Sequence, residues 1–219
     1  NGKTTTTFLI KHICEKAGVR CGLLGTVQYE IGDRILPAIR TTPEALDIQE
    51  LLAQIVSAGG RAAAMEVSSH ALAQERTRGI EWDVAVFTNL TQDHLDFHGT
   101  MEKYFDAKAK LFLQLASQSK KKRAIAVINS DDRYGQKLVD RIGGKIPVVT
   151  YGLGLHADFR ASNYRTEFAG TSYQLDACRW SYLVRVPLIG RFNVANSMAA
   201  LAAATALGHH AGALLVLQR

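Results

Sequence analysis

Asn1-Gly2-Lys3-Thr4-Thr5 opens the sequence, and its N-G-K-T core matches the second half of the phosphate-binding pattern G-x-x-x-x-G-K-[ST]. In this pattern the glycine lets backbone N–H groups face phosphate oxygens, the lysine reaches the β- and γ-phosphates, and the threonine hydroxyl can bind Mg²⁺. A lone G-K-T is a weak signal that would otherwise indicate a glycine turn before a surface helix. Because an apolar helical pattern and then an apolar strand follow, we predict a nucleotide-binding loop, in a fragment that lacks at least one upstream segment.

The composition of the 219 residues is that of an ordinary globular protein, with 47% apolar and 21% charged residues. This length allows one large domain or two small ones. The net charge of +6 suits anionic ligands such as nucleotides and carboxylates. The basic run Lys120–Arg123 contains no interleaved aromatic residues, so we interpret it as the solvated end of a helix and expect no nucleic-acid binding.

Cysteine content and hydropathy indicate a cytosolic chain that does not cross a membrane. The three cysteines, Cys14, Cys21 and Cys178, are odd in number and lack metal-type spacing, which is typical of reduced, buried thiols. The alanine-rich run Ser197–Leu207 is far shorter than a membrane span. We therefore expect a cytoplasmic protein with no membrane span.

Helical and strand patterns alternate along most of the chain. Predicted strands cover residues 21–26, 62–67, 83–88, 124–128 and 147–151. Predicted helices cover residues 4–17, 69–76, 101–115, 131–142 and 193–207, and one more has Thr42 as its N-cap and ends at Gly59-Gly60. This order predicts an α/β fold with a mostly parallel, doubly wound sheet of the phosphate-loop type.

Two smaller parts depart from that alternation. A hairpin is expected to turn at Gly32-Asp33, and residues 158–186 read as antiparallel strands packed beside the main sheet. We assign residues 1–208 to a single domain and residues 209–219 to the beginning of the next segment.

Two further motifs fall at predicted strand ends, where open α/β sheets bind ligands. Glu66 closes one strand and could hold Mg²⁺ across from Thr4; a helix-entry glutamate beside a capping serine is the alternative. Asp93-His94-Leu95-Asp96-Phe97-His98-Gly99 follows another strand and concentrates groups that bind metals or transfer protons. Any one of these groups alone would more often be a structural loop residue. From the residues alone, Lys108 is interpreted as a solvent-facing helix lysine.

Several motifs together resemble one family. N-G-K-T-T-T, R-T-T-P-E, E-V-S-S-H, T-N-L-x-x-D-H-L-D-F-H-G, A-K-x-x-L-F and G-R-F-N-V-A-N are similar to the central domain of the Mur ligases, in particular the MurE type, the UDP-N-acetylmuramoyl-tripeptide synthetases. The resemblance runs from Asn1 to about Gly208. The pair E-V-S-S-H and H-L-D-F-H-G is highly specific, since folylpolyglutamate synthetases, for example, typically read G-K-G-S in the loop.

The resemblance implies an ATP-dependent amide ligase of peptidoglycan synthesis with three domains, of which this chain is the central one and inactive alone. The absent N-terminal domain would bind UDP and the absent C-terminal domain the incoming amino acid. Phosphoryl transfer from ATP would convert the carboxylate of UDP-MurNAc-L-Ala-D-Glu into an acyl phosphate, which the amine of meso-diaminopimelate or L-lysine attacks in the cytoplasm. The sequence does not name the amino acid, and a monomer is expected.

Matching positions assign roles to individual residues. The residues implied in catalysis are Lys3, His94 and Lys108, the last carried as a carbamate derived from CO₂. Two Mg²⁺ sites would use Thr4, Glu66, His94 and Lys108. ATP would contact Asn1, Gly2, Lys3, Thr4, Thr5, Asn193 and Asn196, although helix capping is an alternative role for both later asparagines. The muramoyl-dipeptide substrate would contact Thr41, Thr42, Ser68, Gln74 and Arg76. Arg40 stands where some relatives carry asparagine.

Other classes of function predict different residues. A phosphate-loop GTPase or kinase would carry an N-K-x-D-like base-reading motif or a lid arginine pattern, and the sequence contains neither. A non-catalytic Mur-like binding module would be favoured by loss of Lys3, Glu66, His94 or Lys108, all of which are present. Another Mur-like amide ligase is the remaining alternative.

Overall fold

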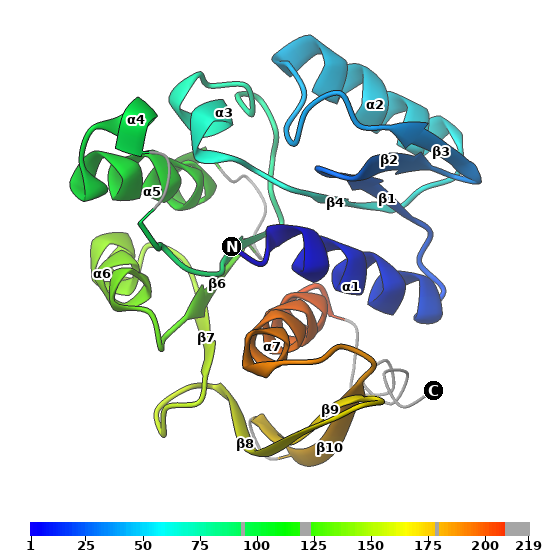
Figure 1. Ribbon diagram of the computed structural model, residues 1–219. Coiled ribbons are helices and arrows are strands. Elements are labelled where there is room, and N and C mark those ends of the chain that lie inside the picture. Colours follow the sequence, from blue (N-terminus) through cyan, green and yellow to red (C-terminus); the bar gives the residue numbers. More distant parts are fainter. Residues whose placement is uncertain (93–94, 119–123, 178–179, 209–219) are drawn as a thin grey trace.

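The computed structural model describes residues 1–92, 95–118, 124–177 and 180–208, and two β-sheets form its framework (Figure 1). The smaller sheet has strand order β3-β2-β1-β4, made of β1 (Cys21–Leu24), β2 (Gln28–Ile31), β3 (Arg34–Pro37) and β4 (Ala62–Met65). The larger sheet has strand order β10-β9-β8-β7-β6-β5, made of β5 (Val84–Phe87), β6 (Ile125–Asn129), β7 (Val148–Gly152), β8 (Phe159–Glu167), β9 (Gly170–Ala177) and β10 (Trp180–Val186). The predicted segment 209–219, the run Lys120–Arg123 and Cys178 lie outside the described residues.

Parallel pairing links the strands that alternate with helices, as the sequence predicted. β1 pairs with β4 in parallel, and β5, β6, β7 and β8 pair in parallel in that order. The hairpin β2–β3 and the strands β8, β9 and β10 are antiparallel. The antiparallel strands of the second half continue the larger sheet, because β8 pairs with β7 at Tyr151 and Phe159. The α/β fold class, with its antiparallel part, is confirmed.

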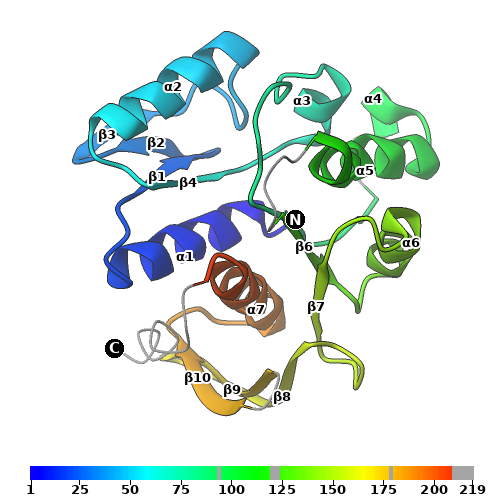
Figure 2. The ribbon, with the colours of Figure 1, turned by 180° about the vertical axis from the view of Figure 1, so that it is seen from behind.

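Helices cover both sheets. α1 (Lys3–Lys16) and α7 (Arg191–Ala206) pack against each other and lie between the two sheets when seen from the front and from behind (Figures 1 and 2). α2 (Ala45–Ser57) covers the other face of the smaller sheet. α3 (Ser69–Ala73), α4 (Leu95–His98), α5 (Met101–Gln118) and α6 (Arg133–Ile142) lie on the far side of the larger sheet. Over the described ranges every helix is too short or too polar to cross a bilayer.

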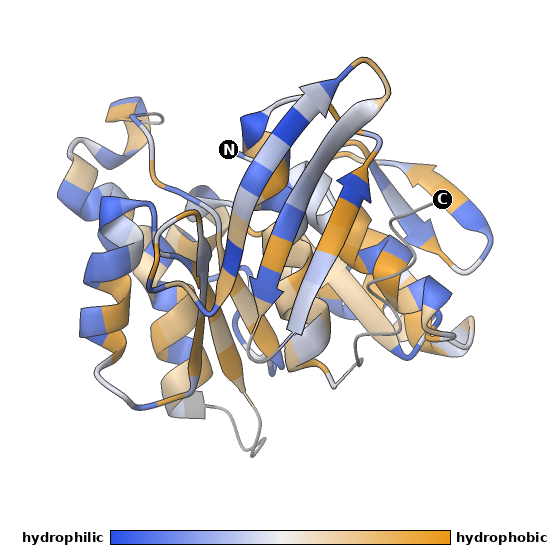
Figure 3. Ribbon diagram, turned by 90° about the horizontal axis from the view of Figure 1, so that it is seen from below, coloured by the Kyte–Doolittle hydropathy of each residue, from blue (hydrophilic) through white to orange (hydrophobic). Residues whose placement is uncertain are grey.

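The main core lies between α7 and the larger sheet. α7 is buried on all sides over most of its length, which explains its alanine-rich sequence, since small side chains let the flanking elements approach closely. Buried and half-buried residues alternate along most of β9. Figure 3 shows apolar and polar residues in alternation along the antiparallel strands of the larger sheet. Tyr173 of β9 and Ser197 of α7 share a hydrogen bond of 2.8 Å inside this core.

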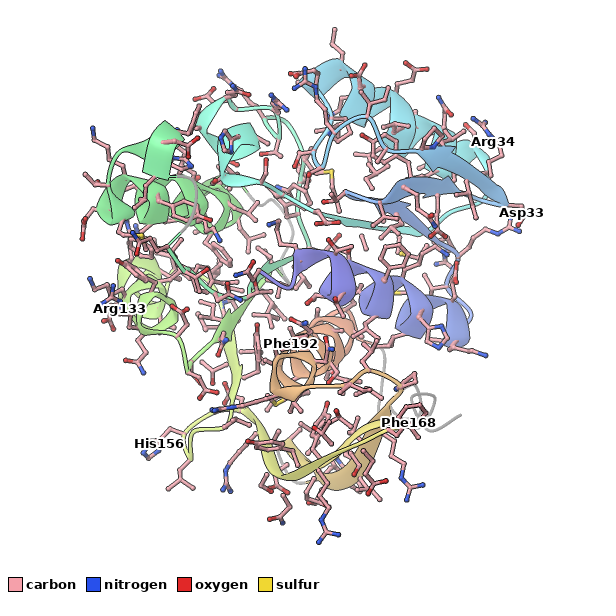
Figure 4. The ribbon with its side chains drawn as sticks, viewed as in Figure 1. Asp33, Arg34, Arg133, His156, Phe168 and Phe192 are labelled. Carbon is pink, nitrogen blue, oxygen red and sulfur yellow. The ribbon has the colours of Figure 1, made fainter. Side chains whose placement is uncertain are left out.

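Two expectations about cysteines and turns are confirmed within the described residues. Cys14 and Cys21 are free and buried, and a hydrogen bond with the Cys14 thiol together with burial raises the pKa of the Cys21 thiol. β2 and β3 join through Gly32 and Asp33, and Gly32 takes a positive φ of 58°. Asp33 and its neighbour Arg34 lie at the outer edge of the molecule (Figure 4).

Two local predictions are wrong. Thr42 does not cap α2, which begins at Ala45 with Glu44 as its N-cap. The Thr42 side chain is used elsewhere: its hydroxyl donates to the carbonyl of Glu66 at 2.8 Å and accepts from the N–H of Ser68 at 3.0 Å. The short helix α4 lies where the sequence predicted only a loop, because Leu95 to Gly99 close one helical turn through the Gly99 N–H.

Candidate functional site

The phosphate-loop motif forms the turn that leads into α1. Gly2 precedes the helix with a left-handed φ of 82°, and its carbonyl accepts the N–H of Thr6 at 3.0 Å. A Cβ atom at Gly2 would collide with the side-chain oxygen of Asn196 in α7. Glycine is therefore required here both by the backbone conformation and by the close approach of another helix.

Asn1 forms hydrogen bonds with residues that directly follow β5. Its carbonyl accepts hydrogen bonds from the Thr88 hydroxyl at 2.9 Å and from the Asn89 side chain at 3.1 Å, and its own side chain donates to Thr91 at 3.1 Å. These contacts place the loop at the carboxyl ends of the parallel strands, which is the edge where α/β sheets bind ligands.

Glu66 lies directly after β4 and faces Thr4. The Thr4 hydroxyl donates to its carboxylate at 2.9 Å, and Thr26, at the end of β1, donates from its N–H at 2.8 Å and from its hydroxyl at 3.1 Å. Glu66 is 2% exposed, and these three hydrogen bonds come from uncharged donors. A buried carboxylate beside a hydroxyl is a donor set that suits a hard cation such as Mg²⁺.

No three His, Cys, Asp or Glu side chains come close enough together to hold a metal ion among the residues that the structure describes.

A cavity of about 620 Å³ opens beside the loop. Its walls come from the phosphate-loop turn, the segment after β1, the segment before α2 and the segment after β4. The residues lining it are Asn1, Gly2, Lys3, Thr4, Thr26, Arg40, Thr41, Thr42, Glu66, Ser68, His70, Gln74 and Arg76. The five residues expected at the muramoyl-dipeptide therefore share one cavity with Asn1, Gly2, Lys3, Thr4 and Glu66, which are expected at the phosphates and the first cation.

Thr42 and Arg76 hold the far wall of the cavity together. Besides its bonds to residues 66 and 68, Thr42 offers its carbonyl to the Arg76 guanidinium at 3.1 Å. Arg76 also pairs with Glu44 at 3.2 Å, and its Nε atom is buried with no partner among the described residues. Arg76 therefore contacts the protein through its two Nη atoms and keeps one buried N–H that no described residue satisfies.

Ser68 has a local structural role as well. It is the N-cap of α3, and its hydroxyl accepts the N–H of Ala71 at 3.2 Å. Gln74 is the C-cap residue of the same helix. This short helix therefore delivers Ser68 and Gln74 to one side of the cavity.

Lys108 is half-buried on α5 and does not face solvent, so the interpretation from the residues alone is wrong. Its Nζ atom donates to the carbonyl of Asn89 at 3.0 Å and lies 5.0 Å from the centre of the Tyr104 ring. Tyr104 in turn stacks on His98, whose Nε2 atom lies 2.9 Å from the Ser69 hydroxyl. A continuous row of contacts thus joins α3, α4 and α5.

Asn89 connects this row to the phosphate loop, because the residue that accepts from Lys108 also donates to Asn1. His94, expected at the second cation, and its neighbour Asp93 lie outside the described residues.

The two asparagines of α7 lie in its first turns, but neither caps the helix, whose N-cap is Gly190. The Asn196 side chain donates to that of Asn193 at 3.0 Å, and Asn193 donates to the carbonyl of Ile189 at 3.0 Å. Asn196 also lies against Gly2. The structure thus brings α7 to the phosphate loop, although Thr5, Lys108, Asn193 and Asn196 do not line the cavity itself.

Sequence reasoning missed Thr26 and Asn89 as individual residues. Both follow the last residue of a strand within two positions, so the rule that strand ends carry ligand-binding residues could have found them. Glu44 was also missed. Its ion pair with Arg76 could not be predicted from the sequence, because the two residues lie in separate segments of the chain.

The chain is similar to known proteins over nearly its whole length. The family model of the Mur ligase middle domain matches residues 1–204. The chain is 47% identical to a UDP-N-acetylmuramoyl-L-alanyl-D-glutamate–2,6-diaminopimelate ligase of Geobacillus kaustophilus over 95% of this chain and 42% of that protein. It is 42% identical to a UDP-N-acetylmuramyl-tripeptide synthetase of Deinococcus radiodurans over 97% of this chain and 41% of that protein.

A solved structure of a UDP-N-acetylmuramoyl-L-alanyl-D-glutamate–2,6-diaminopimelate ligase superimposes with a TM-score of 0.89 at 36% identity, covering 100% of this chain and 44% of that one. The chain therefore spans less than half the length of these three relatives. Its sequence from Asn1 to Ala204 and its fold agree on one assignment: the chain belongs to the Mur ligase family, whose middle domain it carries.

Proposed function

We propose that this chain is the ATP-binding domain of a longer enzyme that joins an amino acid to UDP-MurNAc-L-Ala-D-Glu. The incoming amine is 2,6-diaminopimelate in this proposal, because the relatives with that name are similar over almost the whole chain; L-lysine is the alternative. The domain acts in the cytoplasm, as a monomer, together with an N-terminal and a C-terminal domain. Residues 1–208 form the ATP-binding domain, and residues 209–219 begin the link to the next one.

One observation carries the proposal. The residues of the phosphate loop and the Arg76–Thr42 wall line the same cavity, with the Thr4–Glu66 pair between them. Phosphoryl transfer needs the γ-phosphate and the accepting carboxylate in one closed site, because most of its catalysis is positioning and electrostatic stabilisation. A cavity with a phosphate site at one end and a buried arginine donor at the other meets that requirement.

Individual residues have distinct roles in this reaction. Lys3 and the N–H groups at the start of α1 bind and orient the phosphates of ATP, with Asn193 and Asn196 near the nucleotide. Thr4 and Glu66 would hold one Mg²⁺, and His94 and a carbamate on Lys108 would hold a second. When bound, Mg²⁺ neutralises the charge that develops on the phosphates. Arg76, Thr41, Thr42, Ser68 and Gln74 orient the muramoyl-dipeptide.

The carboxylate oxygen of the dipeptide displaces ADP at the γ-phosphorus and forms an acyl phosphate. The amine then attacks the acyl carbon, an amide bond forms, and phosphate leaves with the oxygen that came from the carboxylate. Activation is needed because a free carboxylate is a poor electrophile, and positive groups around the cavity stabilise the negative charge of both steps.

The transfer of oxygen gives a direct test. Full-length enzyme with ATP, an amine and dipeptide substrate labelled with ¹⁸O in its terminal carboxylate should release phosphate that carries one ¹⁸O atom for each amide formed. Diaminopimelate and lysine are supplied in parallel reactions to identify the amine. Nucleotide binding without any phosphate release would contradict the enzyme proposal and favour a non-catalytic binding module, and unlabelled phosphate would contradict the acyl-phosphate route.

A further inference from the structure

A cluster of aromatic side chains lies between the ligand cavity and Lys108. It consists of His70 of α3, Phe97 and His98 of α4 and Tyr104 of α5, and the three helices lie side by side in Figures 1 and 2. The centre of the His70 ring lies 4.1 Å from that of Phe97 and 5.6 Å from that of His98, and His98 stacks on Tyr104 at 4.9 Å. Because His70 lines the cavity and Tyr104 lies against Lys108, the cluster connects the cavity with this lysine.

His98 occupies the centre of the cluster and is buried. Its Nε2 atom shares a hydrogen bond of 2.9 Å with the hydroxyl of Ser69, which is also buried. Breaking a bond between two buried groups is costly, because the group that is left behind has no water to replace its partner. His98 itself does not line the cavity, so its effect on a ligand must pass through its neighbours.

Ser69 places this hydrogen bond at the first turn of α3. Its two neighbours in the chain, Ser68 and His70, both line the cavity. α3 has only five residues, and a helix this short is unstable by itself, so tertiary contacts decide its position. The bond from Ser69 to His98 is such a contact, and it acts between the two residues that face the ligand.

α5 provides the fixed side of this arrangement. It has 18 residues, and its Phe112 side chain is buried against Phe87 of β5, with 6.3 Å between the ring centres. Tyr104 and Lys108 are one turn apart on α5 and therefore lie on the same face of it. His98 thus ties a short helix of the cavity wall to a long helix of the core, at the turn that carries Lys108.

We propose that His98 is a positioning residue of the ligase reaction. Through Ser69 it fixes Ser68 and His70 in the cavity wall, and through Tyr104 it fixes this wall relative to Lys108. The inference rests on the proposed function, since it takes the ligand at this wall to be the muramoyl-dipeptide. Loss of His98 should therefore weaken dipeptide binding selectively and leave nucleotide binding at the phosphate loop intact.

A purely structural role for His98 leads to a different expectation. A buried histidine that only fills the core stabilises the whole domain, and its replacement lowers the melting temperature without distinguishing between ligands. Binding of two ligands to the folded protein, measured well below the melting temperature, therefore separates the two roles.

His98→Phe tests the hydrogen bond, since phenylalanine keeps a ring that can stack on Tyr104 but has no atom that can bond to Ser69. Calorimetry on the full-length protein measures binding of UDP-MurNAc-L-Ala-D-Glu and, separately, of a non-hydrolysable ATP analogue with Mg²⁺. The Kd of the dipeptide should rise about tenfold, and the Kd of the nucleotide should change less than about twofold. His156→Phe, at an exposed histidine between β7 and β8 (Figure 4), is the matched control and should change neither Kd.

His98→Gln is the conservative variant and separates binding from turnover. The glutamine amide can replace Nε2 in the bond to Ser69, so the Kd of the dipeptide should stay within about threefold of the wild-type value. Glutamine cannot stack on Tyr104 as a ring does, so kcat should be about two- to tenfold lower, because the turn that carries Lys108 loses a contact. A wild-type kcat in this variant would overturn the link to Lys108.

Ser69→Ala removes the other partner of the same hydrogen bond and leaves every ring in place, so it tests the proposal even if His98→Phe does not fold. It should weaken dipeptide binding about as much as His98→Phe does. Because both changes remove one bond, the double variant should bind no more weakly than either single variant. Ser57→Ala, at an exposed serine of α2, is the control.

The possible results distinguish this inference from the proposed function. A selective loss of dipeptide affinity in His98→Phe and Ser69→Ala that is absent in His98→Gln supports the inference. Equal losses for dipeptide and nucleotide, strictly additive losses in the double variant, or unchanged dipeptide affinity would overturn it and leave the proposed function intact. A wild-type protein that binds the nucleotide but not the dipeptide would overturn the proposed function and this inference with it.

Discussion

The hydroxyl of Thr4 donates a hydrogen bond of 2.9 Å to the carboxylate of Glu66, although 62 residues separate the two in the chain. The contact joins the start of α1 to the end of β4. It places a hydroxyl of the phosphate loop, which can bind a cation through a neutral oxygen, beside a buried carboxylate. The first prediction concerns that carboxylate.

Glu66→Gln in the full-length enzyme should lower kcat about 10²–10³-fold while changing the melting temperature little. The amide has the same shape: its oxygen can still accept from the Thr26 N–H and its NH₂ group can donate to the hydroxyls of Thr4 and Thr26, but it lacks the charge that binds Mg²⁺. Steady-state ligation over a Mg²⁺ titration and a thermal melt measure both effects. Glu50→Gln, which alters an exposed glutamate of α2 that contacts Gln54 and does not line the cavity, is the control. Near-normal activity with unchanged Mg²⁺ dependence would show that Glu66 is only structural.

Arg76→Ala should raise the KM for the nucleotide-sugar peptide more than the KM for ATP. The guanidinium lines the cavity, and loss of a charged hydrogen bond to the peptide would cost about 1.5–3 kcal/mol, or roughly 10–150-fold in affinity. Arg78→Ala, two residues away, is the matched control, because Arg78 is exposed and pairs with the exposed Glu75 rather than with a residue of the cavity. Equal losses for both substrates would argue against a role in peptide binding.

Thr42→Val should destabilise the protein by about 1–3 kcal/mol, since it leaves the Glu66 carbonyl and the Ser68 N–H without their buried partner. Urea denaturation of the full-length protein measures the loss. Thr41→Val is the control: its half-buried hydroxyl accepts from the Thr26 hydroxyl at 3.1 Å, and the change should cost less than about 0.5 kcal/mol. A stable Thr42→Val protein with weakened peptide binding would assign the hydroxyl to the substrate instead.

Gly2→Ala should be more harmful than Gly18→Ala, although both glycines have nearly the same positive φ, 82° and 78°. A Cβ at Gly18 meets open space, so its cost is the backbone strain of about 1–2 kcal/mol. A Cβ at Gly2 also meets the Asn196 side chain. Urea denaturation should show that Asn196→Ala recovers part of the stability lost in Gly2→Ala and none of that lost in Gly18→Ala. Strictly additive effects in the first pair would contradict the close contact.

Lys108→Ala should remove most ligase activity, with partial recovery on addition of formate or acetate, whose oxygens can replace those of a carbamate. Formation of the carbamate bonds the neutral Nζ atom to the carbon of CO₂ and releases a proton. Lys108→Arg should remain inactive, because a guanidinium stays charged and does not react in this way. Lys110→Ala, an exposed lysine on the same helix, is the control. A ¹³CO₂-labelled NMR spectrum that shows no carbamate in fully active enzyme would disprove the modification.

The sequence alone was sufficient for the fold class and the family, because both depend on local patterns. The alternation of apolar strands and amphipathic helices predicts parallel pairing wherever it occurs. The G-K-T motif predicts a helix that begins at the edge of the sheet. The rule that ligands bind at strand ends also selected Glu66 correctly as a neighbour of Thr4. These features follow from residues that are close together in the chain.

Only the tertiary structure decided which neighbours each of these residues has. The inward position of Thr42, the ion pair of Arg76 with Glu44 and the contact of Lys108 with Asn89 all depend on where separate segments lie after the sheets have formed. Thr42 shows the physical reason: its sequence context favours a helix cap, but a buried carbonyl and a buried N–H needed a partner, and satisfying them stabilises the fold more than one cap does. The local sequence therefore predicts one role for Thr42. Its actual role depends on backbone groups that are distant in the chain and that form hydrogen bonds with its hydroxyl.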